Sequence, residues 1–476
     1  MNNSAVIHGI RWNLFTTVIR RILSLALLIY LASWLSQGDF GVFRTYSLIL
    51  AITSVFAVIG MDSNLITDQS HIKLNLFSFA QVGLGLGVLC SLLLALSSVW
   101  LARLYHSLEL GTIIRWTSLF VLVEVLRKLL RSIAQTRLMF KDLALAETWN
   151  VVFYCLLSFS VIYFYRHVWV YVVAYYLGNL VETIYLYVRL KPSPSLQLKR
   201  LLSIKWLNYS CANIKKNRAF LLNVSAIRLL NTYAGNAPIL FLGTMVSAAF
   251  MGQYFFATQL IGVPVIMFTM AVGQVFYPVF AQSDTSRTIQ SINSYTRLTL
   301  SLGIPLLIVY GYALKLAIPW LFTGKWDAAI PLLFSLIPYF GSSMLNDPIS
   351  GIPFICRKPH WELVWNAISL FLRLLLLLWG MKYGFAFAVL LFSLGSAFMN
   401  LVFYFMSLYL LKAKLLPALA SICLWSVSIL ALMAILHFVA RGSLPILYGS
   451  ICFIIYLLAV FAFAKPVYSD VRRIIR

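Results

Sequence analysis

The sequence predicts an all-α polytopic membrane protein with about 14 transmembrane helices. Of its 476 residues, 62% are hydrophobic and only 11% are charged, and the mean hydropathy is +0.90. This composition is typical of an integral membrane protein and excludes a soluble globular domain. At about 20 residues per span plus short loops, the chain has room for about 12–14 helices. Its apolar runs are continuous rather than alternating, which excludes transmembrane β-strands.

Six predicted spans form an N-terminal lobe at residues 1–190, because each contains an apolar window long enough to cross a bilayer. These spans lie at residues 13–35, 42–67, 75–101, 112–136, 144–165 and 168–190. A polar connection at residues 191–218 follows, with two prolines, four serines and seven Lys or Arg. We interpret it as a basic cytoplasmic linker between two lobes, part of which lies along the membrane surface.

A second six-helix lobe is predicted at residues 219–410. Its spans lie at residues 219–244, 250–280, 292–321, 328–352, 361–380 and 384–410. Ser36-x4-Gly41 follows the first span and Ser247-x4-Gly252 follows the seventh, as expected for a duplicated transporter. Because an even number of spans separates the two motifs, the two bundles are predicted to be pseudo-symmetric and parallel in the membrane.

The last part of the chain, residues 411–476, is predicted to add two helices at 417–438 and 444–465 and a basic cytoplasmic tail. With the N-terminus placed in the cytoplasm, most Lys and Arg fall in inner loops, which satisfies the positive-inside rule. An even number of spans then leaves both termini cytoplasmic. The net charge is +24, from 37 Lys and Arg against 13 Asp and Glu. Basic inner loops lying against anionic lipid explain most of this excess, so no nucleic-acid partner is expected.

The motifs of several enzyme classes are missing from the sequence. There is no G-x-x-x-x-G-K-[ST] loop for nucleotide hydrolysis. The six cysteines are scattered without a C-x-x-C pair, and the six histidines lack metal-ligand spacing. We therefore expect no catalytic residues, no metal site and no cofactor, and we interpret the chain as a carrier.

Four charged residues occupy the middle of the predicted span at 112–136. Arg127, Lys128 and Arg131 lie three, four and seven positions after Glu124, so on an α-helix they form one stripe. A charge at the bilayer centre costs about 2.5–3.5 kcal/mol on insertion scales. The stripe must therefore face other protein or a water-filled cavity. Glu124 can neutralise one cation as the charge-balancing residue, and at least two cations would remain for an anionic partner.

Further cations lie within or beside other predicted spans: Arg20 and Arg21 on the first, Arg44 at the start of the second, and Arg228 on the seventh. If these helix faces converge with the stripe, they form a cationic cavity that would fit a pyrophosphate, because Arg offers planar bidentate donors and Lys a point charge. An alternative stays open for Arg20, Arg21 and Arg44, whose side chains could instead reach lipid phosphates at the membrane surface. The candidate substrate-binding set is Arg20, Arg21, Arg44, Arg127, Lys128, Arg131 and Arg228.

Three segments resemble polysaccharide flippases of the multidrug/oligosaccharidyl-lipid/polysaccharide (MOP) exporter superfamily. L-S-Q-G-D-F-G-V-F-R at 35–44 is similar to the turn after their first helix. I-P-W-L-F-T-G-K-W-D-A-A-I-P-L-L at 318–333 resembles the segment between helices nine and ten, and A-V-G-Q-V-F-Y-P-V-F at 271–280 resembles the end of helix eight. The chain departs from the family at the usual proline of the first turn, which is replaced by Ser36 or Gln37.

The resemblance implies a Wzx-type flippase, which is a transporter and not an enzyme. Such a protein moves an undecaprenyl-pyrophosphate-linked oligosaccharide, such as an O-antigen repeat unit of lipopolysaccharide, from the cytoplasmic to the periplasmic leaflet by alternating access. It implies the bacterial inner (plasma) membrane as location. The expected partners are the lipid-linked oligosaccharide, membrane lipids, a polysaccharide polymerase and the chain-length machinery. No cofactor is expected, although transport could be coupled to an ion gradient of unknown ion.

Three other functions stay open. A cation-coupled multidrug exporter of the same superfamily would need intramembrane carboxylates, for which the sequence offers Asp62, Glu124, Glu182 and Asp347. A lipid II flippase would share the mechanism but serve peptidoglycan. A membrane-bound glycan polymerase would need a sizeable outer loop, and the predicted outer loops are short.

Overall fold

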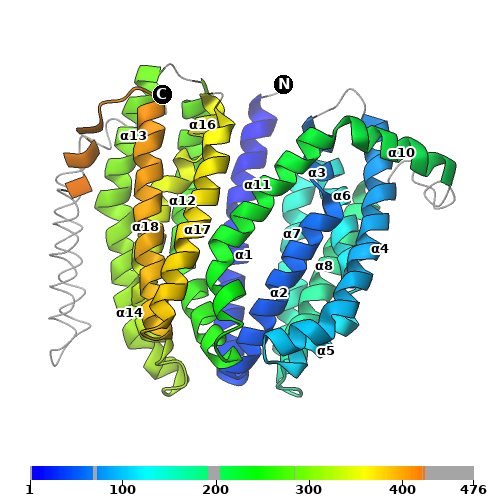
Figure 1. Ribbon diagram of the computed structural model, residues 1–476, viewed down its shortest axis with the longest axis horizontal. Helices are drawn as coiled ribbons and strands as arrows, with labels where there is room; N and C mark the ends of the chain where they lie inside the picture. Colours follow the sequence, from blue (N-terminus) through cyan, green and yellow to red (C-terminus); the bar gives the residue numbers. More distant parts are fainter. Residues whose placement is uncertain are drawn as a thin grey trace. The chain divides into compact units, whose positions relative to one another are not determined.

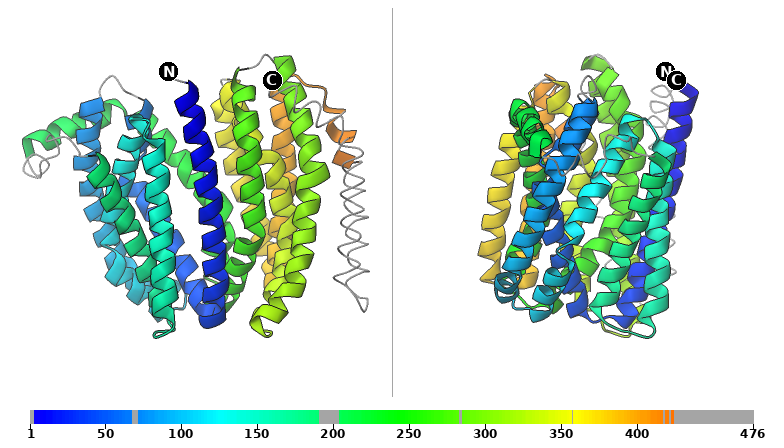
Figure 2. Two further views of the ribbon diagram at one scale, coloured as in Figure 1. Left: turned by 180° about the vertical axis from the view of Figure 1, so that it is seen from behind. Right: turned by 90° about the vertical axis from the view of Figure 1, so that its right-hand side faces the viewer.

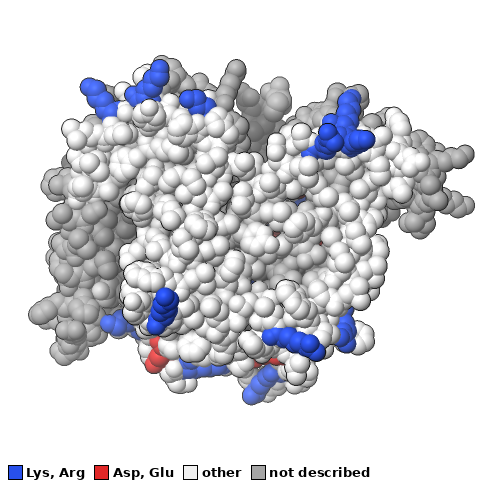
Figure 3. Space-filling model, viewed as in Figure 1, with Lys and Arg blue, Asp and Glu red and all other residues white. Residues whose placement is uncertain are grey.

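The computed structural model describes residues 3–67, 72–190, 204–282, 285–356, 358–416, 418–420 and 422–423, and over these residues the chain is helical with no strand (Figure 1). The predicted all-α class is therefore confirmed for the described residues. Nine helical segments among them are long and apolar enough to cross a membrane. The chain forms two compact units, Met1–Phe255 and Phe256–Arg476. On the face of each unit shown in Figure 3, the Lys and Arg side chains lie near the helix ends.

The first unit is a bundle in which α7 and α8 pack along each other, α1 packs on α7, and α6 contacts both α4 and α8 (Figure 2). Its elements are α1 (Asn3–Trp34), α2 (Gln37–Val58), α3 (Met61–Thr67), α4 (Ile72–Leu104), α5 (Leu108–Thr117), α6 (Phe120–Thr136), α7 (Phe140–Ile162), α8 (Val168–Leu190), α10 (Ile204–Lys216), α11 (Arg218–Ala237), the π-helical turn η2 (Pro238–Leu242) and the start of α12 (Ala248–Gln282). All seven cations of the candidate set belong to this unit.

Side-chain caps set where two of these helices begin. The Ser36 hydroxyl accepts a hydrogen bond from the Asp39 backbone N–H at 3.1 Å, and the Asp39 carboxylate accepts one from the Ser36 backbone N–H at 2.8 Å. This reciprocal capping box satisfies two donors that the first turn of α2 would otherwise leave unpaired. At the start of α5, the Ser107 hydroxyl accepts from the Leu110 backbone N–H at 3.2 Å.

The predicted spans at 42–67 and 112–136 are each divided into two helices, so their prediction as single helices was wrong. The span at 42–67 is divided between α2 and α3, because Ile59 and Gly60 adopt positive φ values of 42° and 63°. The span at 112–136 is divided into α5 and α6. At this break the hydroxyls of Thr117 and Ser118 donate to backbone carbonyls of α5, and such side-chain bonds compete with the helical ladder.

The two repeated motifs of the sequence meet in space, at the start of α2 and the start of α12. A methyl group added to Gly41 would lie 1.9 Å from the Ala248 carbonyl oxygen, and one added to Gly252 would lie 1.7 Å from the Gln37 carbonyl oxygen. The Gln253 amide also donates to the Gln37 side-chain oxygen at 2.8 Å. Only glycine permits this backbone-to-backbone approach, which explains why both motifs carry one.

The predicted lobe boundary at 191–218 does not coincide with the limit between the compact units, which falls after Phe255. The reason is that α10 packs on α4, while α11 packs on α2 and α3. Residues 191–203 of the predicted linker lie outside the described residues. The remaining part is helical, as α10 and the start of α11, and the assignment of the two lobes stays a prediction.

The second unit is built around α15, which packs on α18, and α17, which also packs on α18. Its core includes the fully buried Trp326, whose ring stacks on Phe256 with centroids 4.2 Å apart. Beyond the rest of α12, its elements are α13 (Thr285–Leu298), the π-helical turn η3 (Thr299–Gly303), α14 (Ile304–Phe322), α15 (Ala329–Asn346), η4 (Asp347–Ile349), α16 (Ile352–Ile355), α17 (Pro359–Met381) and α18 (Phe385–Leu410). Apart from 418–420 and 422–423, the predicted C-terminal helices and the basic tail lie outside the described residues, so the total of about 14 spans stays a prediction.

Candidate functional site

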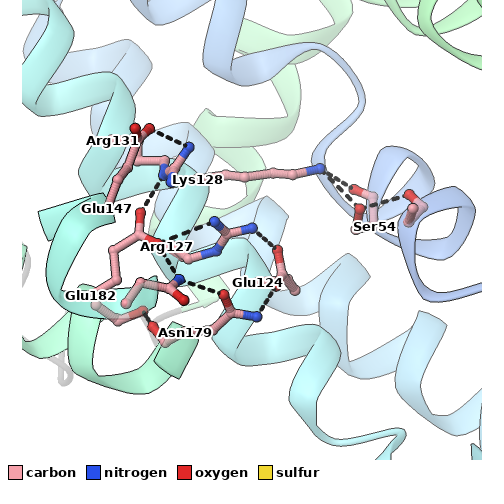
Figure 4. A network of polar contacts seen from close by, with 11 residues as sticks. Ser54, Glu124, Arg127, Lys128, Arg131, Glu147, Asn179 and Glu182 are labelled. Carbon is pink, nitrogen blue, oxygen red and sulfur yellow. Dashed lines mark hydrogen bonds and ion pairs between the residues drawn. The ribbon is translucent and has the colours of Figure 1, made fainter. Parts of the chain in front are cut away.

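The charged stripe lies on α6, inside the first unit. This helix contacts α7 and α8 on one side and α2 and α3 on another. Its buried apolar residues, such as Val121, Val125 and Leu129, pack into the bundle. The charged side chains of the stripe divide between the two sides, as Figure 4 shows.

Two arginines of the stripe point toward α7 and α8 and bind carboxylates there (Figure 4). Arg127 donates to Glu124 at 2.6 Å and to Glu182 of α8 at 3.4 Å. Arg131 donates through Nε to the other oxygen of Glu182, and its Nη1 lies 3.2 Å from Glu147 of α7. The Glu182 side chain is fully buried, so this carboxylate is satisfied by protein donors rather than by water.

Two asparagines complete the same network. Asn150 of α7 donates to Glu182 at 2.7 Å and to the Asn179 side-chain oxygen at 2.8 Å. Asn179 of α8 in turn donates to Glu124 at 3.1 Å. Each buried carboxylate oxygen of Glu124 and Glu182 therefore has a donor, as a buried charge requires.

The first helix joins this network through Arg20. Its guanidinium forms an ion pair with Glu147 and donates to the Thr17 hydroxyl at 2.6 Å. Glu147 therefore bridges α1 and α6, because it binds Arg20 and Arg131 at once. The neighbouring Arg21 is half-buried, and among the described residues no ion pair includes it.

This arrangement corrects the expected charge balance. Glu124 was expected to neutralise one cation and to leave at least two of the stripe without a carboxylate. The structure instead matches three guanidiniums with three carboxylates, which are Arg20, Arg127 and Arg131 against Glu124, Glu147 and Glu182. Glu124 thus shares the balancing role with two other carboxylates, and Lys128 is left as the remaining cation of α6.

Lys128 points the opposite way, toward α2 (Figure 4). Its ammonium donates to the Ser54 hydroxyl at 2.9 Å and is 3.4 Å from the Ser54 carbonyl oxygen. Among the described residues, no carboxylate forms an ion pair with it. A hydroxyl and a carbonyl supply only partial negative charge, so these contacts with Ser54 do not neutralise Lys128.

The two other predicted cations have separate partners. Arg228 of α11 forms a bidentate pair with Asp62 of α3, with both oxygens 2.6 Å from Nη1. Arg44 of α2 donates to Asn236 at 2.5 Å, next to the kink where Asn236 leaves helical geometry. The seven cations therefore do not form one continuous cluster. Arg20, Arg127 and Arg131 are joined through carboxylates, whereas Lys128, Arg228 and Arg44 form their hydrogen bonds with other partners.

Several residues of the network were missed by the sequence reasoning. Glu147 was not considered, and Glu182 was considered only as a feature of a drug exporter. A usable signal existed, because Glu147 and Asn150 are three residues apart on α7, as are Asn179 and Glu182 on α8. This is the same spacing rule that identified the stripe on α6. Among the described residues, no group of side chains could hold a metal ion.

The bundle shares its fold with membrane transporters of known structure. The lipid II flippase MurJ, in an inward closed conformation, superposes with a TM-score of 0.74 at 14% sequence identity, covering 96% of this chain and 98% of that one. A multidrug resistance MATE family transporter of the MOP superfamily, in an inward-facing conformation, gives a TM-score of 0.63 at 11% identity, covering 83% of this chain and 94% of that one. The fold class is therefore that of these transporters.

Within that class, the chain belongs to the polysaccharide biosynthesis protein family, which matches residues 30–331. It is 24% identical over 372 residues to the lipopolysaccharide biosynthesis protein WzxC of Escherichia coli strain K12, covering 77% of this chain and 73% of that protein. It is 21% identical over 333 residues to the teichuronic acid biosynthesis protein TuaB of Bacillus subtilis strain 168, covering 69% and 66%. The resemblance inferred from the three sequence segments is confirmed.

Proposed function

We propose that this chain is a flippase that moves a lipid-linked oligosaccharide across the bacterial inner membrane. The observation that carries the proposal is the family match over residues 30–331 on a chain that has the fold of a lipid flippase. The names of its relatives, which concern lipopolysaccharide and teichuronic acid biosynthesis, support a surface-polysaccharide precursor as cargo. An undecaprenyl-pyrophosphate-linked repeat unit, such as an O-antigen unit, is the substrate we propose.

In this proposal, the intramembrane cations of the first unit have two different roles. Arg20, Arg127 and Arg131 hold α1, α6, α7 and α8 together through carboxylates. Lys128 and the half-exposed Arg228 contact the anionic head of the cargo, because the two cations act on each other and one carboxylate, Asp62, acts on both. Partial balance by Asp62 keeps binding reversible, which a carrier requires in order to release its cargo. Arg21 and Arg44 are further candidates for this contact.

Energy for transport is proposed to come from an ion or membrane-potential gradient, since the sequence carries no phosphate-binding loop of the G-x-x-x-x-G-K-[ST] type. A polysaccharide polymerase with its chain-length machinery is the partner we propose, because such enzymes consume the flipped repeat unit. The drug-exporter alternative has less support, since the buried Glu124 and Glu182 are held by arginines rather than open to a cationic drug.

Deleting the gene in its host tests the function. We expect an undecaprenyl-pyrophosphate-linked oligosaccharide to accumulate in the cytoplasmic leaflet, and a plasmid copy of the wild type to remove it. The measurement is mass spectrometry of extracted lipids together with a surface-glycan stain. Accumulation of lipid II would point instead to peptidoglycan, and drug sensitivity without any glycan accumulation would overturn the proposal.

Complementation by variants tests the site. Lys128→Gln is expected to reach wild-type levels in the membrane and to restore little surface glycan, whereas Lys128→Arg, which keeps the charge, is expected to restore it in part. The matched control is Lys141→Gln, which removes an exposed cation at the start of α7. If Lys128→Gln complements as well as Lys141→Gln does, Lys128 does not contact the cargo.

A further inference from the structure

The short helix α10 is seated on α4 by polar side chains. The Ser210 hydroxyl donates to the Gln81 side-chain oxygen at 2.8 Å. Asn213 donates to Asn75 at 3.0 Å and to the Ser78 hydroxyl at 3.1 Å. Ser210 and the three α4 residues that accept these bonds, Gln81, Asn75 and Ser78, are buried, so the hydrogen bonds fix the position of α10 on the bundle.

The seat places α10 at one end of the apolar part of α4. The segment Asn75–Leu104 of this helix is long and apolar enough to span a bilayer. All three residues that hold α10 lie in the first two turns of that segment. Figures 1 and 2 show α10 running across this end of α4 rather than along it. Because this segment is predicted to cross the bilayer, α10 is expected to lie in the interfacial layer of the membrane.

The side chains that α10 presents outward suit that layer. Leu207 is 39% exposed and Tyr209 is 55% exposed. At the other end of α10, Lys215 and Lys216 are exposed, and Arg218 follows at the start of α11. Figure 3 shows Lys and Arg side chains gathered over this corner between α10 and α11. Residues 191–218 contain seven Lys or Arg and no Asp or Glu, so no acidic residue of this stretch competes for them.

We propose that α10 is an in-plane anchor that binds anionic phospholipid headgroups. Leu207 and Tyr209 would enter the interface, while Lys215, Lys216 and Arg218 would bind lipid phosphates. An acidic protein partner is less favoured, because α10 is seated at the start of the span predicted for α4, beside lipid. Since α11 begins at Arg218, directly after α10, lipid contact here also sets where α11 enters the membrane.

The exposed Cys211 of α10 provides a reporter for the test. The full chain, with its other cysteines replaced by Ala and Cys211 carrying a bimane label, is reconstituted in phosphatidylcholine vesicles. Quenching of the label by brominated phosphatidylglycerol and by brominated phosphatidylcholine then gives the relative binding constant of the two lipids at α10. We expect phosphatidylglycerol to be preferred, and Lys215→Gln with Lys216→Gln to lower that preference by about fivefold per charge removed.

The control is Lys412→Gln with Lys414→Gln, which removes two exposed cations from the second unit and is expected to leave the preference unchanged. Equal quenching by the two lipids would overturn the proposal. So would a label that responds to aqueous iodide and not to any brominated lipid, because α10 would then face water. If both double variants lowered the preference for phosphatidylglycerol equally, that preference would depend on net charge and not on the surface of α10, which would also overturn the proposal.

Discussion

The cations on two sides of the same helix, α6, have different partners. Toward α7 and α8, Arg127 and Arg131 are held by Glu124, Glu147 and Glu182. Toward α2, Lys128 has only the oxygens of Ser54. A charge on such a helix therefore does not by itself mark a binding site. What matters is whether the surrounding helices supply an opposite charge.

The residue types on the two sides fit these different roles. A guanidinium presents donors in several directions, so one Arg can bridge two carboxylates on different helices. An ammonium is a compact charge on a flexible side chain. The Lys128 ammonium can therefore exchange its contact with Ser54 for a contact with an anion. Removing an ion from water costs several kcal/mol unless it is paired. The ion pairs on the side of α6 that faces α7 and α8 therefore depend on the fully buried Glu182, which binds both arginines.

The largest expected effect comes from removing that carboxylate. Glu182→Ala leaves Arg127, Arg131 and Asn150 without their shared acceptor, and the expected loss is about 3–5 kcal/mol in the free energy of unfolding. Denaturant unfolding of the purified protein in detergent measures it. The control is Glu109→Ala, which removes a carboxylate that is 34% exposed and pairs with His167. Similar losses for both variants would contradict the distinction between a buried network and a peripheral pair.

A double-mutant cycle on Arg131 and Glu147 is expected to give the next largest effect. The two side chains are 3.2 Å apart and partly exposed, so their coupling free energy should fall at about 0.5–3 kcal/mol. The four proteins are wild type, Arg131→Gln, Glu147→Gln and the double variant, compared by unfolding. The Arg131→Gln effect should exceed that of Glu147→Gln, because Arg131 also binds the fully buried Glu182, whereas Glu147 is partly exposed. A coupling of zero would show that the bridge between α6 and α7 contributes nothing.

Lys128→Met compared with Arg127→Met tests the two sides at adjacent positions of one helix. Lys128→Met removes a hydrogen bond to Ser54 and strands no carboxylate, so the expected cost is about 1 kcal/mol. Arg127→Met deprives Glu124 and Glu182 of a shared partner and should cost several times more. Thermal unfolding monitored by circular dichroism distinguishes them. Equal losses would mean that Lys128 is also part of the structural network.

The smallest effect is expected at the Asp62–Arg228 pair, where the Arg228 side chain is 37% exposed. Asp62→Asn should change the free energy of unfolding by about 0.2–1 kcal/mol, because solvent screens this pair. The remaining attraction should weaken further at high salt, which unfolding curves at two ionic strengths measure. A cost as large as that of Glu182→Ala would place Asp62 within the buried network.

Much of the fold followed from sequence pattern, because apolar windows report which segments can cross a bilayer. Seven of the described elements, for example α7 and α8, lie close to the predicted spans, but the breaks at Ile59 and Ser118 were not anticipated. A window average is insensitive to one or two residues with unusual backbone geometry. The glycines of the two repeated motifs were noticed in the sequence, yet only the structure shows that Gly41 and Gly252 bring two helices into contact.

For the site, spacing and hydropathy predict which charges lie within apolar segments, because both are properties of a single segment. The spacing also predicts one stripe of Glu124, Arg127, Lys128 and Arg131 on α6, whereas the structure directs Lys128 toward α2, away from the partners of the two arginines. Which of these charges are neutralised follows only from the packing of the helices in the tertiary structure. Glu147 and Glu182 belong to other helices, and an ion pair depends on side-chain direction over a few ångströms. Helix packing thus pairs Arg20, Arg127 and Arg131 with carboxylates. Lys128 is left without a carboxylate ion pair among the described residues.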